Sequence, residues 1–419
     1  MYQVEASRAL LKPRTWATPS ARLSVPRNVV LLGTVSLLTD VSAEMVATVL
    51  PLYLVFSLGV SPLALGAIDG LYRGAAAIVQ IGGGLLSDRF QRHKEVATLG
   101  YGLSALCKVG LVAAGGSVGG IGALVASDRI GKGIRTAPRD ALISLSSTKA
   151  GLATAFGVHR AMDSAGAMLG PLVAFGILLL APARFDAVFV VSTVFALLGL
   201  AVLVLAVQGR PERAPAAPAA RPPSFRKALG IARDPRFRLL LIAAGALAVV
   251  SVSDALIYVG LQRQSGFDPT VFPLLFVVTA VAFMALAIPV GRLADRIGRV
   301  PVLLAGHALL LPVYGLLLSP VGTAGLLFAL LALGAYFAAT DGVTTALAGA
   351  ILPERLQATG IGILITVMSL GKFASSLAFG ALWMALGLQD AVLLFAAGLL
   401  VALVLTTPML LRLRPEPAA

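Results

Sequence analysis

Long apolar stretches recur along the whole chain and are separated by short polar segments. A helix needs about 20 mostly apolar residues to cross a hydrocarbon layer about 30 Å thick. Lipid offers the backbone no hydrogen bonds, so a spanning segment must be a helix or a strand of a closed barrel, and these stretches lack the alternation of barrel strands. Hydrophobic residues make up 58% of the chain and charged residues only 12%. We therefore expect an all-α membrane protein.

Twelve spans can be placed, six on each side of a central polar gap. The first six cover residues 28–57, 63–87, 96–116, 118–146, 151–180 and 184–207. The last six cover residues 238–261, 268–290, 300–318, 321–350, 357–386 and 388–411. We expect two six-helix bundles, at 28–207 and 237–411, with tails at 1–27 and 412–419. The gap at 208–236 is predicted to be a cytoplasmic linker, Pro/Ala-rich and flexible at first, then basic enough to lie on anionic headgroups.

Basic residues predict which side of the membrane each loop occupies, because Lys and Arg of short loops are retained in the cytoplasm. One set of loops holds only Arg184 and Arg263. The other side collects the N-terminal tail, Arg89, Arg92, Lys94, Arg135, Arg139, Lys149, Arg160, the stretch from Arg210 to Arg238, Arg292, Arg296, Arg299, Arg355, Arg412 and Arg414. We expect a multi-pass protein of the cell (inner, cytoplasmic) membrane with both termini in the cytoplasm. Topology thus explains the net charge of +14, and no nucleic-acid partner is expected.

The residue types that usually carry catalysis or metal binding are scarce. Cys107 is the single cysteine, which excludes a disulfide within the chain, and the three histidines at 93, 159 and 307 are too scattered for a metal cluster. No nucleophile stands beside a base. We expect no enzyme activity, no cofactor and no bound metal.

The two halves repeat each other. An offset of 207 aligns Gly84, Leu86, Asp88, Arg89 and Arg92 with Gly291, Leu293, Asp295, Arg296 and Arg299. An offset of 205 aligns Ala153, Thr154, Gly157 and Gly166 with Ala358, Thr359, Gly362 and Gly371. The two offsets, 207 and 205, differ by only two residues, and this agreement predicts a duplicated six-helix unit.

The repeated loop motifs resemble signatures of the major facilitator superfamily, and the resemblance extends over essentially the whole chain. GRLADRIGRV at 291–300 is similar to the family's cytoplasmic signature between helices 8 and 9. GGLLSDRFQRHK at 83–94 is similar to its counterpart between helices 2 and 3, except that Gln91 stands where the family usually has Gly. The resemblance implies the major facilitator fold of twelve helices in two bundles.

Two further motifs resemble signatures that the family links to proton coupling. Arg129, followed by two glycines on helix 4, is similar to the family's second signature. Gly166, Gly170 and Pro171 on helix 5 are similar to a Gly-x-x-x-Gly-Pro signature associated with proton-driven exporters. Helix packing alone is the alternative explanation of this motif.

The loop motifs also have a physical interpretation as a gate. Gly84 and Gly291 would permit close helix contact, while Asp88 and Asp295 would cap a neighbouring helix and pair with arginine. The arginines of the predicted gate are Arg89, Arg92, Arg296 and Arg299. Such contacts would latch the halves together on the cytoplasmic side. Alternatively, the arginines only set topology and the aspartates only neutralise them.

Ionisable residues at mid-membrane depth are candidate functional groups, because each costs about 2.5 kcal/mol or more there unless it faces protein or water. Asp40 and Glu44 lie one helical turn apart on one face and could hold a proton between them, so we assign proton coupling to them with Asp128 and Arg129. The remaining candidates are assigned to the substrate cavity: Asp69, Arg73, Lys132, His159, Asp163, Asp254, Asp341 and Lys372.

Several of these residues also have a purely structural explanation. Asp69 and Arg73 could be a structural ion pair within helix 2, and Lys108 could snorkel or bridge. Asp254 and Asp341 could pair with Lys372, or cap helix kinks made by neighbouring glycines, without touching the substrate. In the superfamily, however, helices 1, 4, 7 and 10 line the central cavity, and each of those helices carries an acidic residue here.

We therefore expect a secondary active transporter that moves a small solute or ion by alternating access, with protons as coupling ion and export by antiport. Proton-coupled uptake of an organic anion or a metal chelate, drawn by Arg73, Arg129 and Lys132, is the alternative. A non-transporting receptor would not need gate motifs in both halves. The protein is expected to act as a monomer within the lipid bilayer.

Overall fold

The computed structural model describes residues 25–90, 92–147, 151–209, 230–231, 233–352 and 357–413. In this part of the chain the regular elements are all helices. The N-terminal half contains α2 (Arg27–Leu52) continued by the π-helical η1 (Tyr53–Ser57), α3 (Pro62–Phe90), α4 (His93–Ala113), α5 (Val118–Leu145), α6 (Leu152–Leu180) and α7 (Phe185–Leu205).

The C-terminal half contains six further spans. They are formed by α9 (Pro235–Val249) with α10 (Asp254–Ser265), the short η2 (Pro269–Val271) with α11 (Phe272–Ile297), α12 (Arg299–Ala308) with α13 (Leu310–Leu316), α14 (Thr323–Ile351), α15 (Gln357–Leu386) and α16 (Leu388–Leu411). Ten helical segments of the described chain are long and apolar enough to cross a membrane by themselves. The long helices α3 and α5, packed on each other, complete the twelve predicted spans.

Two spans of the C-terminal half are broken rather than continuous, which the apolar pattern did not predict. Span 7 unwinds between α9 and α10 at residues 250–253. Span 9 is interrupted at Leu309, close to Pro312, whose ring and missing N–H disturb the preceding helical turn.

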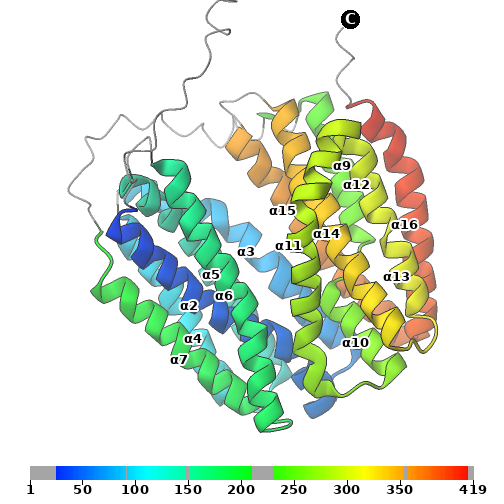
Figure 1. Cartoon of the computed structure of the whole chain (residues 1–419), viewed down its shortest axis with the longest axis horizontal. Coiled ribbons are helices and arrows are strands. Elements are labelled where there is room, and N and C mark those ends of the chain that lie inside the picture. The colour runs from blue at the N-terminus through cyan, green and yellow to red at the C-terminus, as the bar shows by residue number, and fades with distance from the viewer. Residues whose placement is uncertain are drawn as a thin grey trace, which may run out of the picture.

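The predicted duplication has a counterpart in the packing. In the N-terminal half α2 packs on α6 and α3 packs on α5; in the C-terminal half the equivalent spans, α9 on α15 and α11 on α14, pack in the same way. Figure 1 shows the two groups of helices side by side, with α2 to α7 in one group and α9 to α16 in the other.

The two halves touch toward one end of the molecule. Gly66, Gly70 and Gly74 of α3 face α15, so closely that a Cβ on Gly70 would lie 3.0 Å from the ring and backbone of Phe373. Small residues allow helices this close an approach inside a membrane. α10 contacts α2 and α3, and η2 contacts α6, near the same end. In Figure 1 the helix groups spread apart toward the opposite end, where α16 ends.

The Gly166–Gly170 motif packs α6 against α2. A Cβ on Gly170 would lie 2.8 Å from the backbone oxygen of Val41, and one on Gly166 would meet the backbone of Leu37. The motif therefore serves helix packing, and its link to export stays a prediction.

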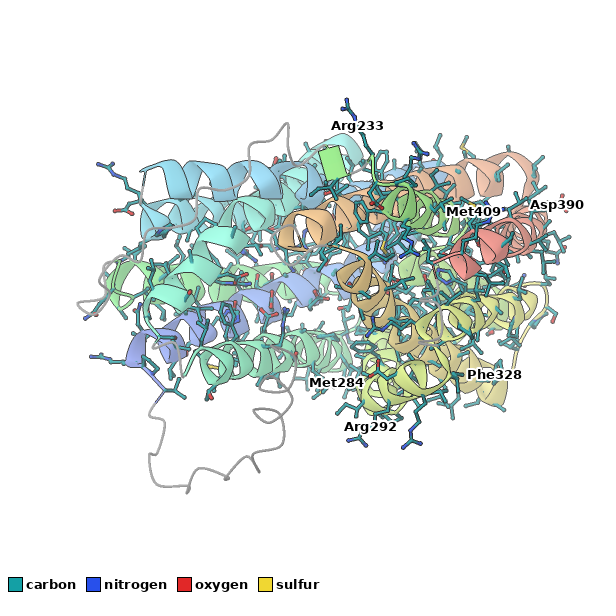
Figure 2. All side chains as sticks on the ribbon, turned by 90° about the horizontal axis from the view of Figure 1, so that it is seen from above. Arg233, Met284, Arg292, Phe328, Asp390 and Met409 are labelled. Atoms are coloured by element: carbon teal, nitrogen blue, oxygen red, sulfur yellow. The ribbon has the colours of Figure 1, made fainter. Side chains whose placement is uncertain are left out.

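The outer surface of the bundle is apolar, as a lipid-facing surface must be. Leu180 and Val404 are 88% and 71% exposed. Figure 2 shows Phe328 of α14 pointing outward from the C-terminal half, and this side chain is 49% exposed. Because lipid tails solvate such residues, their exposure agrees with the predicted membrane location.

We predict that Gly166→Leu destabilises the protein and that Gly176→Leu does not. The added side chain at 166 must push α2 and α6 apart, and overpacking of this kind costs about 1–3 kcal/mol. A Cβ at Gly176 of the same helix would meet nothing within 4 Å. The midpoint of thermal unfolding in detergent measures the difference, and equal midpoints for the two variants would contradict the packing role.

Candidate functional site

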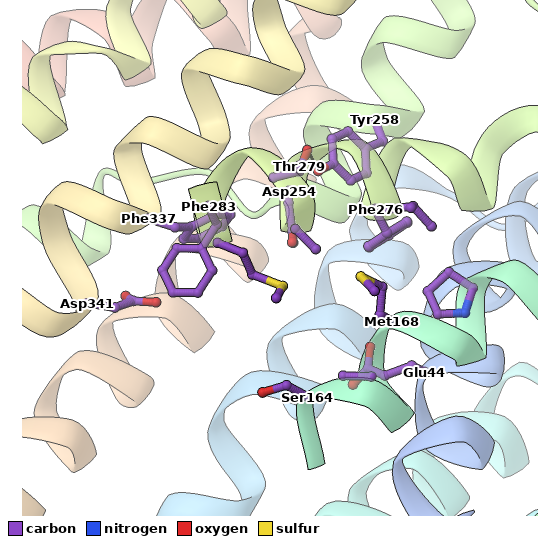
Figure 3. A pocket seen from close by; sticks show the side chains of 15 residues that line it. Glu44, Ser164, Met168, Asp254, Tyr258, Phe276, Thr279, Phe283, Phe337 and Asp341 are labelled. Atoms are coloured by element: carbon purple, nitrogen blue, oxygen red, sulfur yellow. Dashed lines mark hydrogen bonds between the residues drawn. The ribbon is translucent and has the colours of Figure 1, made fainter. Parts of the chain in front are cut away.

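A cavity of about 490 Å³ lies between the two halves (Figure 3). Its walls come from α2, α6, α10, α11 and α14. The lining residues are Glu44, Ser164, Ala167, Met168, Pro171, Asp254, Tyr258, Phe276, Val277, Thr279, Ala280, Phe283, Met284, Phe337 and Asp341. Three of them carry a carboxylate and none carries a basic group. This volume is in the range of cavities that bind drug-sized molecules.

Four aromatic rings contribute to the apolar wall. Phe276 packs edge-on against Tyr258, with 4.8 Å between ring centroids and 81° between planes. The Tyr258 hydroxyl donates a hydrogen bond of 2.6 Å to Thr279 Oγ1, which fixes the ring. Phe283 and Phe337 lie nearer to Asp341 in Figure 3. The rings of Tyr258 and Phe276 are thus held in place before any solute arrives.

Glu44 and Asp341 lie on opposite sides of the cavity (Figure 3). Glu44 comes from α2 of the N-terminal half and Asp341 from α14 of the C-terminal half. Neither carboxylate has an ion-pair partner within 4.0 Å among the described residues, whose pairs involve other groups. Two predicted site residues therefore face one cavity without an ion-pair partner among the described residues.

Asp254 belongs to an ion cluster that joins the two halves. Arg73 of α3 bonds Asp69 one turn away, at 3.1 Å, and also donates to Asp254 of α10. Ser376 of α15 donates a hydrogen bond of 2.6 Å to Asp69. The structural ion pair considered for Asp69 and Arg73 is thus present, with partners from the other half.

The alternative pairing of Asp254 with Lys372 was wrong, because Asp254 pairs with Arg73 instead. Nor does Asp341 form an ion pair with Lys372 in the described residues, although both line a small cavity that also contains His307. A sequence could not show this, since the partner of Asp254 lies 181 positions away.

The break in span 7 places Asp254 at the start of a half-helix. Ser253 caps α10 by accepting a hydrogen bond from the Leu256 N–H, and the positive end of the helix dipole favours the carboxylate there. Tyr314 donates to the Val250 carbonyl at 3.0 Å and accepts from the Val252 N–H at 2.8 Å, while Ser375 donates to Ser251 O. The unwound backbone is therefore satisfied inside the bundle, as lipid requires.

Asp128 and Arg129 lie behind the cavity rather than in its wall. Asp128 Oδ2 lies 2.6 Å from an Arg129 nitrogen and 3.4 Å from Lys108 Nζ, with all three residues 5% exposed or less. The Arg129 guanidinium also stacks 4.1 Å from the centre of the Tyr72 ring. Tyr72 and Glu44 line a second cavity of about 200 Å³ that adjoins the first at Asp254 and Phe276. Lys108 thus bridges rather than snorkels.

Asp40 lies beside Asp163 of α6, and their carboxyl groups are within hydrogen-bonding reach. Arg139 approaches Asp163 at 3.8 Å and bonds Asp140 at 2.9 Å. Glu44, one turn further along α2, lines the cavity whereas Asp40 does not. The two adjacent carboxyl groups, those of Asp40 and Asp163, thus belong to different helices, α2 and α6.

Lys132 and His159, also predicted to belong to the substrate cavity, do not line it and form no ion pair among the described residues. Lys132 is half-buried on α5, and its charge acts on Asp40. His159 of α6 is 4% exposed, and its Nε2 has no hydrogen-bond partner in the described structure.

The gate motif of the C-terminal half makes contacts only within that half in the described residues. Asp295 and Arg299 are 3.7 Å apart, and Arg299 donates to the Ala346 carbonyl. Gly298 turns the chain between α11 and α12 with a φ of +101°, which favours glycine. The expected close helix contact at Gly291 was wrong for this conformation, because a Cβ there would meet nothing within 4 Å.

The remaining gate residues give less information. Arg296 is exposed, and Arg92 is an exposed residue just before α4. The surroundings of Gly84 and the side chains of Asp88 and Arg89 lie outside the described part of the chain. The latch therefore stays a prediction.

Sequence reasoning missed the aromatic wall and part of the buried charge. Phe276, Phe283 and Phe337 are indistinguishable in sequence from the phenylalanines that face lipid. Arg135 was taken only as a marker of topology, yet it is 4% exposed, donates to Ser104 and stacks on Tyr101. Its position inside a predicted span was the available signal. Among the described residues, no group of three or more His, Cys, Asp or Glu could hold a metal ion.

Comparison with known proteins places these features in a family. The family model of the Major Facilitator Superfamily matches residues 32–259 and 251–419. An MFS-type transporter of Methanocaldococcus jannaschii, itself uncharacterised, is 33% identical over 374 residues, which cover 85% of this chain and 88% of the relative. A Mycobacterium tuberculosis protein is 35% identical over 156 residues, 37% of this chain and 38% of that protein.

Several solved transporters share the fold. The nucleoside transporter NupG superposes with a TM-score of 0.76 at 14% identity, covering 91% of this chain and 99% of that one. A POT family transporter in complex with 5-aminolevulinic acid gives 0.74 at 13% identity, covering 93% and 97%. A bacterial homologue of the lysosomal transporter Spinster, in an inward-facing, unoccupied conformation, gives 0.70 at 15% identity, covering 93% and 98%. At these identities the likeness concerns the fold alone.

We predict that Arg73→Gln loosens the contact between the halves. Removing the cation leaves Asp69 and Asp254 unpaired, and breaking a buried pair in this way costs about 3–5 kcal/mol, less here because the Arg73 side chain is 20% exposed. Spin labels on cysteines introduced at Ser61 and Gln389, in a Cys107→Ser background, should report longer and broader distances, and the unfolding midpoint should fall.

The matched control is Arg184→Gln. Arg184 pairs with Asp186, but both side chains are more than 60% exposed. This variant should change neither readout. If Arg73→Gln behaved like Arg184→Gln, the ion cluster would not hold the halves together.

Proposed function

Because the chain belongs to the major facilitator superfamily, we propose that it exports a small solute in exchange for protons, by alternating access to the cavity between its halves. That it is a membrane transporter of the MFS type follows from the family itself. The direction and the coupling ion are the further steps of the proposal.

The observation that carries the proposal is the position of the cavity. Its wall is contributed by both halves, with Glu44 from one side and Asp341 from the other. The halves pack against each other at one end, through α3 and α15. A rocking motion of one half against the other would therefore open the same site to the other side, as in transporters built from repeats.

The proposed orientation rests on the basic residues. The start of α2 and the end of α16 lie at one end of the bundle, opposite to α10 (Figure 1). The Lys- and Arg-rich segments are predicted to be cytoplasmic. We therefore place both termini in the cytoplasm of an inner membrane protein, with the halves closed toward the outside.

The proposed proton path uses the carboxyl groups of α2. Asp40 and Asp163 lie within hydrogen-bonding reach, and two adjacent carboxyl groups are stable together when they share a proton. Glu44, one turn away, has no ion-pair partner among the described residues and faces the cavity. A proton that reaches Glu44 would neutralise a group that otherwise attracts solute, so proton binding and solute binding compete. Because the proton and the solute compete for binding, protons moving in one direction are exchanged for solute moving in the other.

We predict that Asp40→Asn and Glu44→Gln each reduce solute-evoked proton flux at least tenfold. Protein in liposomes with an internal pH-sensitive dye is exposed to a panel of solutes, and the pH change is followed. Asp390→Asn is the control, because this exposed carboxylate at the start of α16 lines no part of the cavity. Unchanged coupling in both acid variants would remove these residues from the mechanism.

The same liposomes separate export from uptake. With an imposed pH gradient, an antiporter accumulates the solute on the acidic side, whereas a proton-linked importer accumulates it on the alkaline side. Accumulation on the alkaline side would contradict antiport and indicate symport. The three carboxylates of the cavity wall disfavour the organic anion considered for that alternative.

A further inference from the structure

We propose that the solute is an organic cation with an apolar body, bound between Asp341 and Glu44. This inference rests on the proposed transport function and names the chemical class of the solute. Three features of the cavity support it: the charge of its wall, its aromatic rings, and the placement of the two carboxylates that lack an ion-pair partner among the described residues.

The described part of the cavity wall contains three carboxylates and no basic residue. Of the three carboxylates, Asp254 is paired with Arg73, whereas Glu44 and Asp341 have no ion-pair partner among the described residues. An unpaired charge within an apolar bundle is costly, and a bound cation would supply the missing partner. An anion would instead meet charge of its own sign.

The rings are the second step. Phe337 precedes Asp341 by one helical turn on α14, so an aromatic surface and a carboxylate lie on the same face. A cation over an aromatic ring gains about 0.5–2 kcal/mol. Met168 and Met284 add flexible apolar surface that adapts to different bodies. For a sugar-like solute the hydroxyl groups of the wall, those of Ser164, Tyr258 and Thr279, would be few.

The placement of the carboxylates is the third step. Glu44 belongs to the N-terminal half and Asp341 to the C-terminal half, on opposite sides of the cavity (Figure 3). A cation attracted by both draws the halves together around itself. Binding energy would thereby be used for closing the transporter.

One basic group opposes this arrangement. Lys372 of α15 shares a small cavity with Asp341, and Arg73 shares a cavity with Lys372 and Asp254. Arg73 is already bonded to Asp69 and Asp254. Lys372 has no ion pair in the described residues, and its positive charge should weaken cation binding. Lys372→Gln is therefore expected to strengthen it.

We test the inference by binding two ions of nearly equal shape and opposite charge. Tetraphenylphosphonium and tetraphenylborate are titrated into the full chain in nanodiscs of neutral lipid, with empty nanodiscs subtracted. We expect saturable binding of the phosphonium and none of the borate. Asp341→Asn should weaken phosphonium binding at least tenfold, equivalent to about 1.4 kcal/mol, and Lys372→Gln should tighten it.

Two control variants make the test specific. Phe337→Ala should weaken binding, whereas Phe328→Ala, on the outward surface of the same helix, should not. Asp390→Asn should leave the affinity unchanged. Unfolding midpoints show that each variant is folded.

Equal binding of the two ions, or an Asp341→Asn affinity equal to that of the unchanged protein, would overturn the cation inference. The transport proposal would survive that result if any solute still evoked proton flux. Conversely, phosphonium binding without solute-evoked flux would refute transport and keep the cation site.

Discussion

The absence of hydrogen-bonding solvent in the bilayer governs this structure, because every polar group inside the bundle must find its partner there. Helices satisfy their own backbone, and the break at residues 250–253 persists because Tyr314 and Ser375 bond its open groups. Charges follow the same rule. Asp128 lies between Lys108 and Arg129, at 3.4 and 2.6 Å. At Glu44 and Asp341, which have no ion-pair partner among the described residues, a cavity is present instead.

Two kinds of interaction hold the halves together: close packing of helix backbones and ion pairs. They respond differently when the halves move apart. Gly66 and its neighbours on α3 bring the helix backbones together, and small residues leave little side chain to rearrange when helices part. The bonds of Arg73 are directional and cross the interface to Asp254. Ionic groups can exchange a protein partner for water when a cavity opens, so this joint can form and break repeatedly. A large apolar interface would resist such cycling.

The sequence predicted most spans to within about four residues, because length and apolarity determine them, although α11 runs to Ile297, seven residues beyond the predicted end at 290. It also predicted the pair of Asp69 and Arg73, since residues one turn apart are neighbours on any helix. It failed where the answer depends on how helices rotate against each other. Whether Asp40 or Glu44 faces the cavity, and which residue meets Asp254, are set by packing across long sequence separations. The break before α10 had a local signal, the capping Ser253, that apolar periodicity overlooks.

The two halves share a fold but not their charges, and the site depends on that difference. With the offset of 207, the position of Asp69 corresponds to Phe276, that of Arg73 to Ala280 and that of Arg129 to Tyr336. The N-terminal copy thus keeps buried ions where the C-terminal copy has rings and small side chains. The cavity between them takes Glu44 from the N-terminal half, and its four aromatic rings, Asp254 and Asp341 from the C-terminal half. The C-terminal copy therefore supplies rings beside two carboxylates, and the N-terminal copy places a third carboxylate opposite them. Divergence after duplication thus gave the two sides of the cavity different chemistry, which two identical copies could not provide.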